Sequence, residues 1–283
     1  MHAQKSYLKT AVSVVDIKGS LDIACDTIDI GFSGQDEEEV FYVILPHIVP
    51  DLPTHLLWLS PPSFNDSLFV KLEDIVNRVI VDSGSSESFL TFIKEMQEYL
   101  TDRKADISDL GWTRLDPWRA LIASEFRTKN EKKLLEKTQR IKITYNAEKN
   151  AYIPHPQSET LYFIFWLASR LNKPFLKKEK ENLIFERLTV EMKKEHRKKQ
   201  RPGSILELEI FSDQSSFSYT RHEQDPQDIH VKIQSEEKCS LPRTIALKKN
   251  ARGASLSREM LKRQTSKHYL QTMDLLKTYA KNS

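Results

Sequence analysis

The sequence predicts an α+β protein. An N-terminal antiparallel meander of about four strands, backed by helices, is expected to precede a mixed α/β domain with a long helix and a small sheet. Three observations support this fold class. The first segments alternate apolar and polar residues, as half-buried strands do. Two segments between residues 68 and 100 repeat apolar residues with helical spacing, and further strand and helix patterns follow them.

The predicted meander consists of short apolar segments separated by turn residues. Residues 12–17 and 27–32 alternate in strand fashion and are expected to pair. Residues 41–45 form a third apolar segment, and a proline-rich link joins them to a fourth at 55–59. Residues 68–79 and 89–100 then carry apolar stripes that would cover one face of this sheet.

Beyond residue 100 the patterns predict shorter elements. They are a loop at 109–117, a helix at 118–137, a strand at 140–145, helices at 159–172 and 176–200, strands at 205–211, 217–220 and 229–233, and a helix around 270–279. Within the helix at 159–172, the aromatic run 161–168 is expected to be buried core. An exposed groove that anchors a partner is the less favoured alternative.

Composition and charge divide the chain into three predicted parts: 1–105 as an interaction domain, 106–238 as a mixed helical and β domain, and 239–283 as a basic tail with a terminal helix. Residues 1–100 hold 6 Lys/Arg and 16 Asp/Glu, whereas residues 101–283 hold 37 and 24. An acidic front and a basic rear indicate different partners for the two halves, or contact between them.

The sequence lacks the residues that several classes of function require. The chain has only 7 glycines and neither dinucleotide-binding nor P-loop motif. Cys25 and Cys239 cannot supply a disulfide framework or a structural zinc site. No apolar run approaches the length of about 20 residues that spans a bilayer, and no signal peptide is visible, so a soluble, intracellular protein is expected.

The segment 41–59 resembles the third and fourth strands of ubiquitin-conjugating enzymes and of the related RWD domains. Pro46, Pro50 and Pro53 match the bend between those strands, with Val49 where a tyrosine is usual. The resemblance implies a sheet backed by helices over the N-terminal third. The cysteine that such enzymes need as nucleophile is missing after this segment, which implies an inactive member that serves as a docking surface.

No catalytic residue, cofactor site or metal site is predicted. His222 and His230 flank three acidic residues, but an exposed hairpin loop explains them better than a metal site. No serine lies in a nucleophile elbow, and the paired carboxylates at 36–39 fit a solvated loop. The chain is therefore expected not to be an enzyme.

Two basic regions are candidate binding sites. The first comprises Lys193, Lys194, Arg197, Lys198, Lys199 and Arg201, which fit nuclear import or phosphate contact as well as they fit a solvated helix end. The second is the tail, with Lys248, Lys249, Arg252, Arg258, Lys262 and Arg263. Ser255 and Ser266 each follow an arginine by three residues, so they are candidate phosphorylation sites.

These observations predict a non-catalytic scaffold or adaptor subunit of a nuclear multiprotein complex. The resemblance implies a ubiquitin-, DNA-repair- or kinetochore-related assembly, with protein partners and no membrane association. Location in the nucleus is expected, with the cytoplasm as an additional site. The alternative is a nucleic-acid-binding protein that uses residues 193–201 and 240–283, although aromatic and basic residues are not interleaved as in an RNA-binding sheet.

Overall fold

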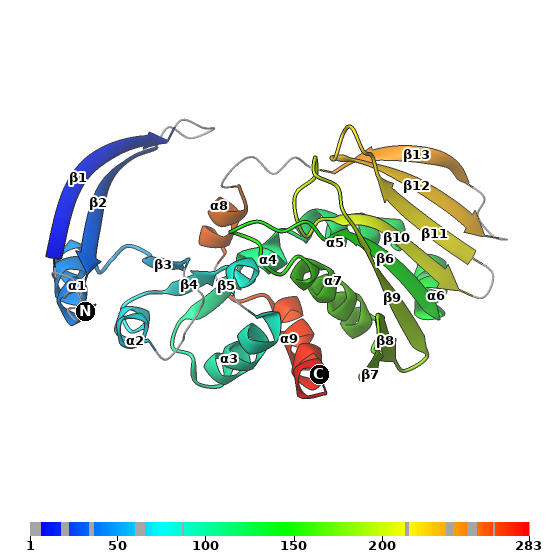
Figure 1. Cartoon of the computed structure of the whole chain (residues 1–283), viewed down its shortest axis with the longest axis horizontal. Helices are drawn as coiled ribbons and strands as arrows, with labels where there is room; N and C mark the ends of the chain where they lie inside the picture. Colours follow the sequence, from blue (N-terminus) through cyan, green and yellow to red (C-terminus); the bar gives the residue numbers. More distant parts are fainter. Residues whose placement is uncertain are drawn as a thin grey trace, which may run out of the picture. The chain divides into compact units, whose positions relative to one another are not determined.

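Figure 1 shows the ribbon of a computed structural model. It describes residues 7–17, 23–33, 37–59, 66–86, 88–212, 215–235, 240–247, 254–262 and 264–282. The chain divides into two compact units, residues 1–56 with 63–77 and residues 57–62 with 78–283. Among the described residues, no helix combines the length and the apolar character that crossing a bilayer requires.

The first unit contains a two-stranded antiparallel hairpin and short helices. Strands β1 (Tyr7–Ile17) and β2 (Ile23–Ser33) pair along their whole length, and α1 (Glu37–Ile44) follows them. The short 3₁₀ helix η1 (Leu45–His47) continues α1, and α2 (Ser67–Glu73) lies against α1.

The predicted four-stranded meander is wrong. Its first two strands do pair, but residues 41–45 belong to α1 and η1 and form no third strand. A short apolar run does not by itself distinguish a strand from a helix. Exposed Glu39 lies in the first turn of α1, where an acidic residue stabilises a helix through its dipole.

A three-stranded sheet begins the second unit. Its order is β3 (His55–Trp58), β4 (Arg78–Val81) and β5 (Asp106–Asp109), and β3 runs across the boundary between the units. Strands β4 and β5 are parallel, with α3 (Phe89–Asp102) between them in the chain. The Ser88 hydroxyl caps α3, which confirms the predicted helix at 89–100.

The helix predicted at 68–79 is correct only in its first half. Helix α2 ends at Glu73, and Val79 belongs to β4, where all four residues are buried. Val79, Ile80 and Val81 are β-branched and fully apolar, as is typical of a parallel strand covered on both faces. Beyond residue 73 the valines and isoleucines happen to follow a helical spacing, although the chain there leaves the helix and enters a strand.

Three short helices replace the predicted loop at 109–117 and the predicted single helix at 118–137. They are α4 (Leu110–Thr113), α5 (Asp116–Glu125) and α6 (Lys129–Glu136). Thr128 begins α6 with a capping box, its side chain and that of Glu131 satisfying each other's backbone amides. This cap is the local reason for the break.

The largest element is an eight-stranded mixed sheet with the order β13-β12-β11-β10-β6-β9-β8-β7. Only the central pair β6–β9 is parallel. The strands are β6 (Arg140–Asn146), β7 (Phe175–Glu179), β8 (Asn182–Phe185), β9 (Leu188–Glu195), β10 (Ile205–Ser212), β11 (Ser215–Arg221), β12 (Asp228–Ser235) and β13 (Ser240–Ala246). The four strands predicted between residues 140 and 233 are confirmed, but the sheet is not small.

The long helix predicted at 176–200 is wrong, because this segment forms β7, β8 and β9. Buried and half-buried residues alternate along β8 and the start of β9, as in strands with one face on the core. The buried ones are Leu183, Phe185, Leu188 and Val190. Lys180 and Arg187 adopt positive φ in the two connecting turns. Neither residue type signals such a turn, since glycine and asparagine are the usual occupants.

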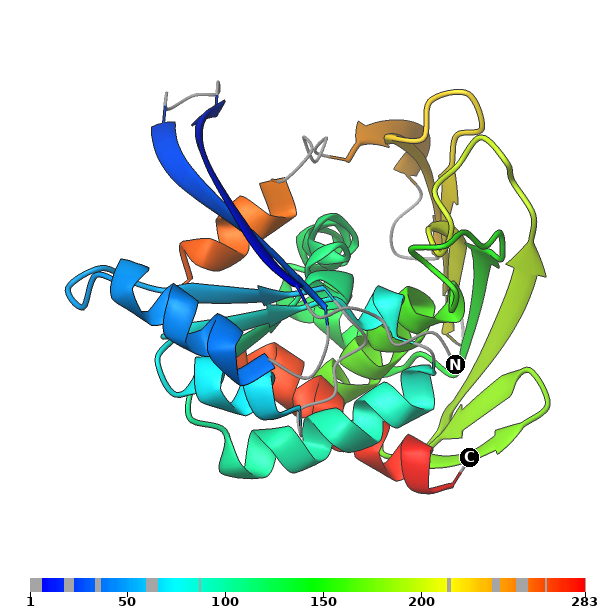
Figure 2. The ribbon, with the colours of Figure 1, turned by 60° about the vertical axis from the view of Figure 1, so that its left-hand side comes forward.

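The core of the second unit is packed around α7 (Gln157–Arg170), which lies beside α9 (Lys267–Lys281) (Figures 1 and 2). All residues from Ser158 to Ala168 are buried, which confirms the predicted core position of 161–168. Phe165 of α7 meets Tyr279 of α9, with ring centroids 5.4 Å apart. Helix α9 also contacts α3 and β7, so it joins the small sheet's layer to the large sheet.

The region predicted as a basic tail contributes ordered elements to the second unit. These are β13, α8 (Ala254–Met260) and α9, the last of which confirms the predicted terminal helix. Thr265 donates to Asp106 of β5 at 2.8 Å, which fixes the start of α9 to the small sheet. The proposed division into three domains at residues 105 and 238 stays a prediction.

Candidate functional site

The carboxyl ends of β4 and β5 place two aspartates at one edge of the small sheet. Asp82 directly follows β4, and Asp109, the last residue of β5, lies opposite Val81 in the parallel register. Asp109 is buried and Asp82 is half-buried. Ligand sites of open α/β sheets form at this edge, so it is the expected position of a site.

Arg114, which follows α4, closes this edge with a bidentate ion pair to Asp82. Its Nη2 lies 2.6 Å from Asp82 Oδ1, and its Nη1 lies 2.9 Å from Oδ2. Burial alone would raise the pKa of Asp82, but the hydrogen bonds and charge of Arg114 outweigh it, so the pKa is lowered. The pair is therefore ionised at neutral pH.

Glu159, near the start of α7, joins Arg114 to a second arginine. Its Oε1 lies 2.7 Å from Nε of Arg114 and 2.7 Å from Nη1 of Arg201. Burial would raise the pKa of Glu159, but the charges of Arg201 and Arg114 lower it. Asp82, Arg114, Glu159 and Arg201 form an ion network in which two positive charges balance two negative ones.

Asp109 lies behind this network and differs from it electrostatically. Its Oδ1 accepts hydrogen bonds from the backbone N–H groups of Ser83, at 3.0 Å, and of Gly111, at 2.8 Å. Burial, and then the negative charge of Asp82, raise the pKa of Asp109 to about 6. Asp109 therefore titrates close to neutral pH, unlike the two carboxylates that are paired with arginine.

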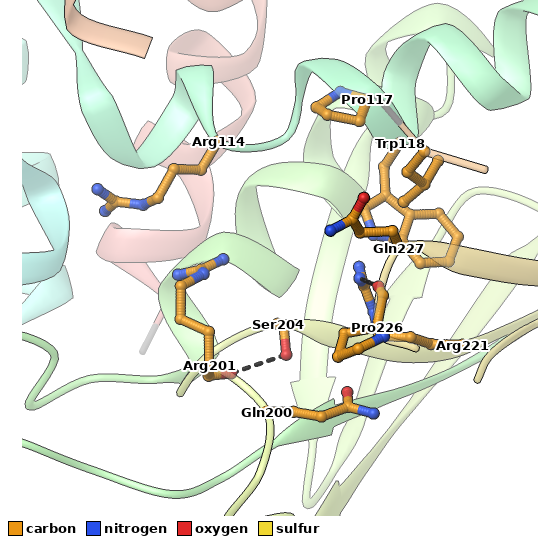
Figure 3. Close-up of a pocket in the computed structure, with 10 residues that line it drawn as sticks. Arg114, Pro117, Trp118, Gln200, Arg201, Ser204, Arg221, Pro226 and Gln227 are labelled. Atoms are coloured by element: carbon orange, nitrogen blue, oxygen red, sulfur yellow. Dashed lines mark hydrogen bonds between the residues drawn. The ribbon is translucent and has the colours of Figure 1, made fainter. Parts of the chain in front are cut away.

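A pocket of about 300 Å³ opens on the other side of the network (Figure 3). Its walls come from the start of α5, from the loop before β10, and from the turn between β11 and β12. The lining residues are Arg114, Pro117, Trp118, Gln200, Arg201, Ser204, Arg221, Pro226, Gln227 and Leu247. Three are arginines and none is acidic.

Arg221, at the end of β11, is the third arginine of this pocket. Its Nε donates to the carbonyl of Ile205 at 2.8 Å, and its Nη1 donates to the carbonyl of Pro226. Its guanidinium lies 5.6 Å from the ring centroid of Trp118. Burial, and then the positive charge of Arg201, lower its pKa to about 10. Within the described chain, no carboxylate lies within ion-pair distance of Arg221.

Buried Asn146 fixes the loop that carries Arg201. Its Nδ2 donates to the carbonyls of Arg197, Gln200 and Arg201, and its Oδ1 accepts from the N–H of Arg197 at 3.0 Å. Gly203 has a φ of +76°, and its N–H donates to the carbonyl of Asn146 at 2.9 Å. These bonds hold the loop in place.

The predicted basic run at 193–201 is divided by the structure. Lys193 and Lys194 lie on β9, whereas Arg197, Lys198 and Lys199 lie in the loop that follows. Arg201 is the one member that lines the pocket. The run is no helix end, so the alternative of a solvated helix terminus is wrong. Its use in import or phosphate contact stays a prediction.

The described residues of the predicted tail set, Arg258, Lys262, Ser255 and Ser266, do not line this pocket. Arg258 is in α8, and Lys262, two residues beyond the end of this helix, pairs with Glu259. Ser255 is in α8, and Ser266 caps α9 by accepting from the N–H of Tyr269. Lys248, Lys249, Arg252 and Arg263 lie outside the described residues. Phosphorylation of either serine stays a prediction.

Sequence reasoning missed Asp82, Arg114, Glu159 and Arg221. They are single charged residues far apart in the chain, so no spacing connects them. One signal was available: Glu159 stands beside the apolar run 161–168 and is 3% exposed. A carboxylate beside a buried helical run requires a cationic partner.

The two histidines considered for a metal site lie together without forming one. The rings of His222 and His230 are 5.3 Å apart, and His230 contacts Thr244 at 3.0 Å. Over the described ranges, no group of three or more His, Cys, Asp or Glu residues is arranged to hold a metal ion.

Two family models match the chain. Residues 1–98 match the N-terminal domain of a glucose-6-phosphate dehydrogenase subunit, and residues 105–273 match the C-terminal domain of the same subunit. A curated relative, the putative OxPP cycle protein OpcA of Nostoc punctiforme, is 29% identical over 160 residues, or 56% of this chain and 33% of the relative. The OpcA protein of Synechocystis is 27% identical over 53% of this chain and 30% of the relative. The match thus spans about a third of their length.

Two solved structures with a similar fold are described as a dehydrogenase and an oxidoreductase. A dehydrogenase (MviM) from Clostridium difficile is 10% identical, with a TM-score of 0.50, and the match covers 81% of this chain and 79% of that chain. A putative oxidoreductase from Erwinia carotovora is 8% identical, also with a TM-score of 0.50, and the match covers 89% of both chains. At this identity the likeness shows a Rossmann-like fold and carries no statement about activity.

These matches correct several predictions. The resemblance to RWD and ubiquitin-conjugating domains is wrong, because the N-terminal segment belongs to a different family with a different fold. The function as scaffold of a nuclear, DNA-repair or kinetochore complex is wrong for the same reason. Nuclear location is wrong too, since the curated relatives are cyanobacterial and bacteria have no nucleus.

The expectation of a protein partner agrees, in its general form, with a family whose members are described as subunits. Together the two family models account for most of the chain, from residue 1 to 98 and from 105 to 273. The chain belongs to the OpcA family of glucose-6-phosphate dehydrogenase subunits.

Proposed function

We propose that this chain binds glucose-6-phosphate dehydrogenase as an accessory subunit and supports its assembly or activity. The observation that carries the proposal is the match of both family models, which cover the chain in the same order as the two domains of one subunit. Because the chain spans about a third of the length of its curated relatives, this function is inferred for the segment that they share.

We propose further that the chain is not itself a dehydrogenase, despite its fold. Dinucleotide-binding folds hold the pyrophosphate with a glycine-rich turn, and the sequence contains no G-x-G-x-x-G motif. At the edge of β4 and β5, the side chain of Arg114 is bound to Asp82 and Glu159. A neutral, closed ion network at this edge fits a structural role better than cofactor binding.

Mixing the purified chain with glucose-6-phosphate dehydrogenase from the same organism tests the first proposal. We expect the two proteins to elute together in size-exclusion chromatography with light scattering. Dehydrogenase activity should change with added chain and saturate at a fixed ratio. A dehydrogenase from an organism that lacks this family is the control. Separate elution, with activity independent of the chain, would contradict the proposal.

Incubating the chain alone with glucose 6-phosphate and a nicotinamide cofactor tests the second proposal. We expect no cofactor reduction above that of a heat-denatured sample. Reduction that scales with the concentration of the chain would show catalysis and sink this proposal, while the binding experiment would still stand.

A further inference from the structure

The pocket beside the ion network has an unbalanced charge. Arg114 and Arg201 are neutralised by Asp82 and Glu159, whereas Arg221 has no carboxylate within ion-pair distance among the described residues. The residues that line the pocket include no aspartate or glutamate. An anion in the pocket would stabilise a half-buried guanidinium in this position.

Two nitrogens of the Arg221 guanidinium are hydrogen-bonded, and the third can still donate to a ligand. Nε and Nη1 donate to the carbonyls of Ile205 and Pro226, and within the described residues Nη2 makes no hydrogen bond. Trp118 lies beside the guanidinium, at 5.6 Å from ring centroid to Cζ. The side chain is therefore fixed in advance, which lowers the entropy cost of binding a ligand.

Gln200 adds an acceptor to the same pocket (Figure 3). It is only 5% exposed, and its Nε2 donates to the carbonyl of His222 at 3.2 Å. Its Oε1 is buried and accepts no hydrogen bond from any described residue. A buried acceptor without a donor is costly, so this atom points to a ligand that carries a hydroxyl group.

We propose that this pocket binds a small phosphorylated polyol, such as a sugar phosphate. The guanidinium fork of Arg221, with Arg201 beside it, suits the phosphate oxygens, and Gln200 and Gln227 suit the hydroxyl groups. Trp118 is buried beneath the guanidinium of Arg221 and supports it at the pocket wall. A volume of about 300 Å³ is at the small end of ligand pockets, which fits a metabolite of this size.

The experiment uses the full chain without any partner, so its outcome is independent of the proposed subunit function. Isothermal titration calorimetry would compare glucose 6-phosphate, inorganic phosphate, glucose, and a short single-stranded DNA. We expect saturable binding of glucose 6-phosphate, weaker binding of inorganic phosphate, and none of glucose. Added salt should weaken the binding, as it does for exposed charge interactions.

Variants test the position of the site. Arg221→Gln should weaken glucose 6-phosphate binding about tenfold or more, as expected for the loss of a charged hydrogen bond. Gln227→Glu places a negative charge at the pocket without removing any contact of Arg221, and should weaken binding similarly. Arg140→Gln is the matched control, because Arg140 is an exposed arginine of the same sheet that pairs with Glu191.

Binding that is lost in both pocket variants and kept in the control supports the proposal. Absence of glucose 6-phosphate binding to the wild-type chain overturns it, as does equal binding by all variants. Binding of DNA alone, lost on Arg221→Gln, also overturns it and assigns the pocket to nucleic acid. Circular dichroism of each variant confirms that loss of binding does not come from unfolding.

Discussion

Glu159 is the residue on which the ion network depends most. It contacts Arg114 and Arg201 and is almost fully buried. We predict that Glu159→Gln lowers the free energy of unfolding by about 2–4 kcal/mol, because it leaves half-buried Arg114 and the more exposed Arg201 with Asp82 as their one remaining carboxylate in the network. Urea unfolding followed by tryptophan fluorescence measures this loss.

The matched control is Glu191→Gln on β9. Glu191 pairs with Arg140 at 2.7 Å, but both side chains are exposed. Such a pair contributes about 0–1 kcal/mol, so this variant should unfold almost like the wild type. Equal losses of unfolding free energy in the two variants would contradict the prediction, because the buried ion pairs of Glu159 would then stabilise the chain no more than an exposed pair does.

Asp109 gives stability a pH dependence of its own. Its pKa is raised from 3.8 to about 6 in the folded chain, so between these values the folded state binds the proton more tightly. The stability that protonated Asp109 contributes to the folded state is fully present below pH 4 and is lost as the pH rises through 6. We predict that Asp109→Asn removes a fall of about 3 kcal/mol between pH 4 and 7. Urea unfolding of both proteins at several pH values gives the difference. Parallel curves would contradict this.

At the scale of elements, the loop between β9 and β10 is set by one buried side chain. Asn146 bonds to Arg197, Gln200 and Arg201, and the loop contains several trypsin sites. We predict that Asn146→Ala destabilises the chain by about 3 kcal/mol and speeds tryptic cleavage there. Limited proteolysis with mass spectrometry identifies the cut. Asn150→Ala, in an exposed turn, should leave the cleavage rate unchanged.

Elements whose apolar residues follow one regular period could be predicted from the sequence. The helix at 89–100 and the strands at 140–145, 205–211 and 229–233 were correct, because in each the apolar residues follow one period and face one core. The segment 176–200 failed for an identifiable reason. Its charged residues suit helix and exposed strand equally, and Lys180 and Arg187 make turns that their residue types do not announce.

The candidate site could be predicted only in small part. Arg201 was among the residues singled out, but as a member of an exposed basic run. Its partner Glu159 and its neighbour Arg221 come from other elements, α7 and β11, which the eight-stranded sheet brings together. Contacts between such distant elements depend on the topology of the fold, which local sequence patterns do not reveal.

At the scale of the whole molecule, α9 holds the second unit together. Leu276 of α9 is fully buried, and Gln97 of α3 donates to the carbonyl of Met273 at 2.6 Å. We predict that Leu276→Ala lowers the free energy of unfolding by about 2–5 kcal/mol. Amide hydrogen exchange should show reduced protection in both β5 and β8, because the two sheets lose the same support.

The control for this prediction is Leu261→Ala. Leu261 is 83% exposed, so its truncation should change stability by no more than about 0.5 kcal/mol. Reduced protection confined to the β7–β9 side in Leu276→Ala would show that the two sheets unfold separately, contrary to the expectation.

The position of α9 in the chain has a consequence for how the protein folds during synthesis. Translation proceeds from the amino terminus, so α3, α7 and β7 leave the ribosome well before residues 267–281 do. Until then, the aromatic side chains that Tyr269 and Tyr279 cover stay exposed to water. The nascent second unit therefore passes through a stage in which chaperones can bind an open hydrophobic surface, and completing α9 ends that stage.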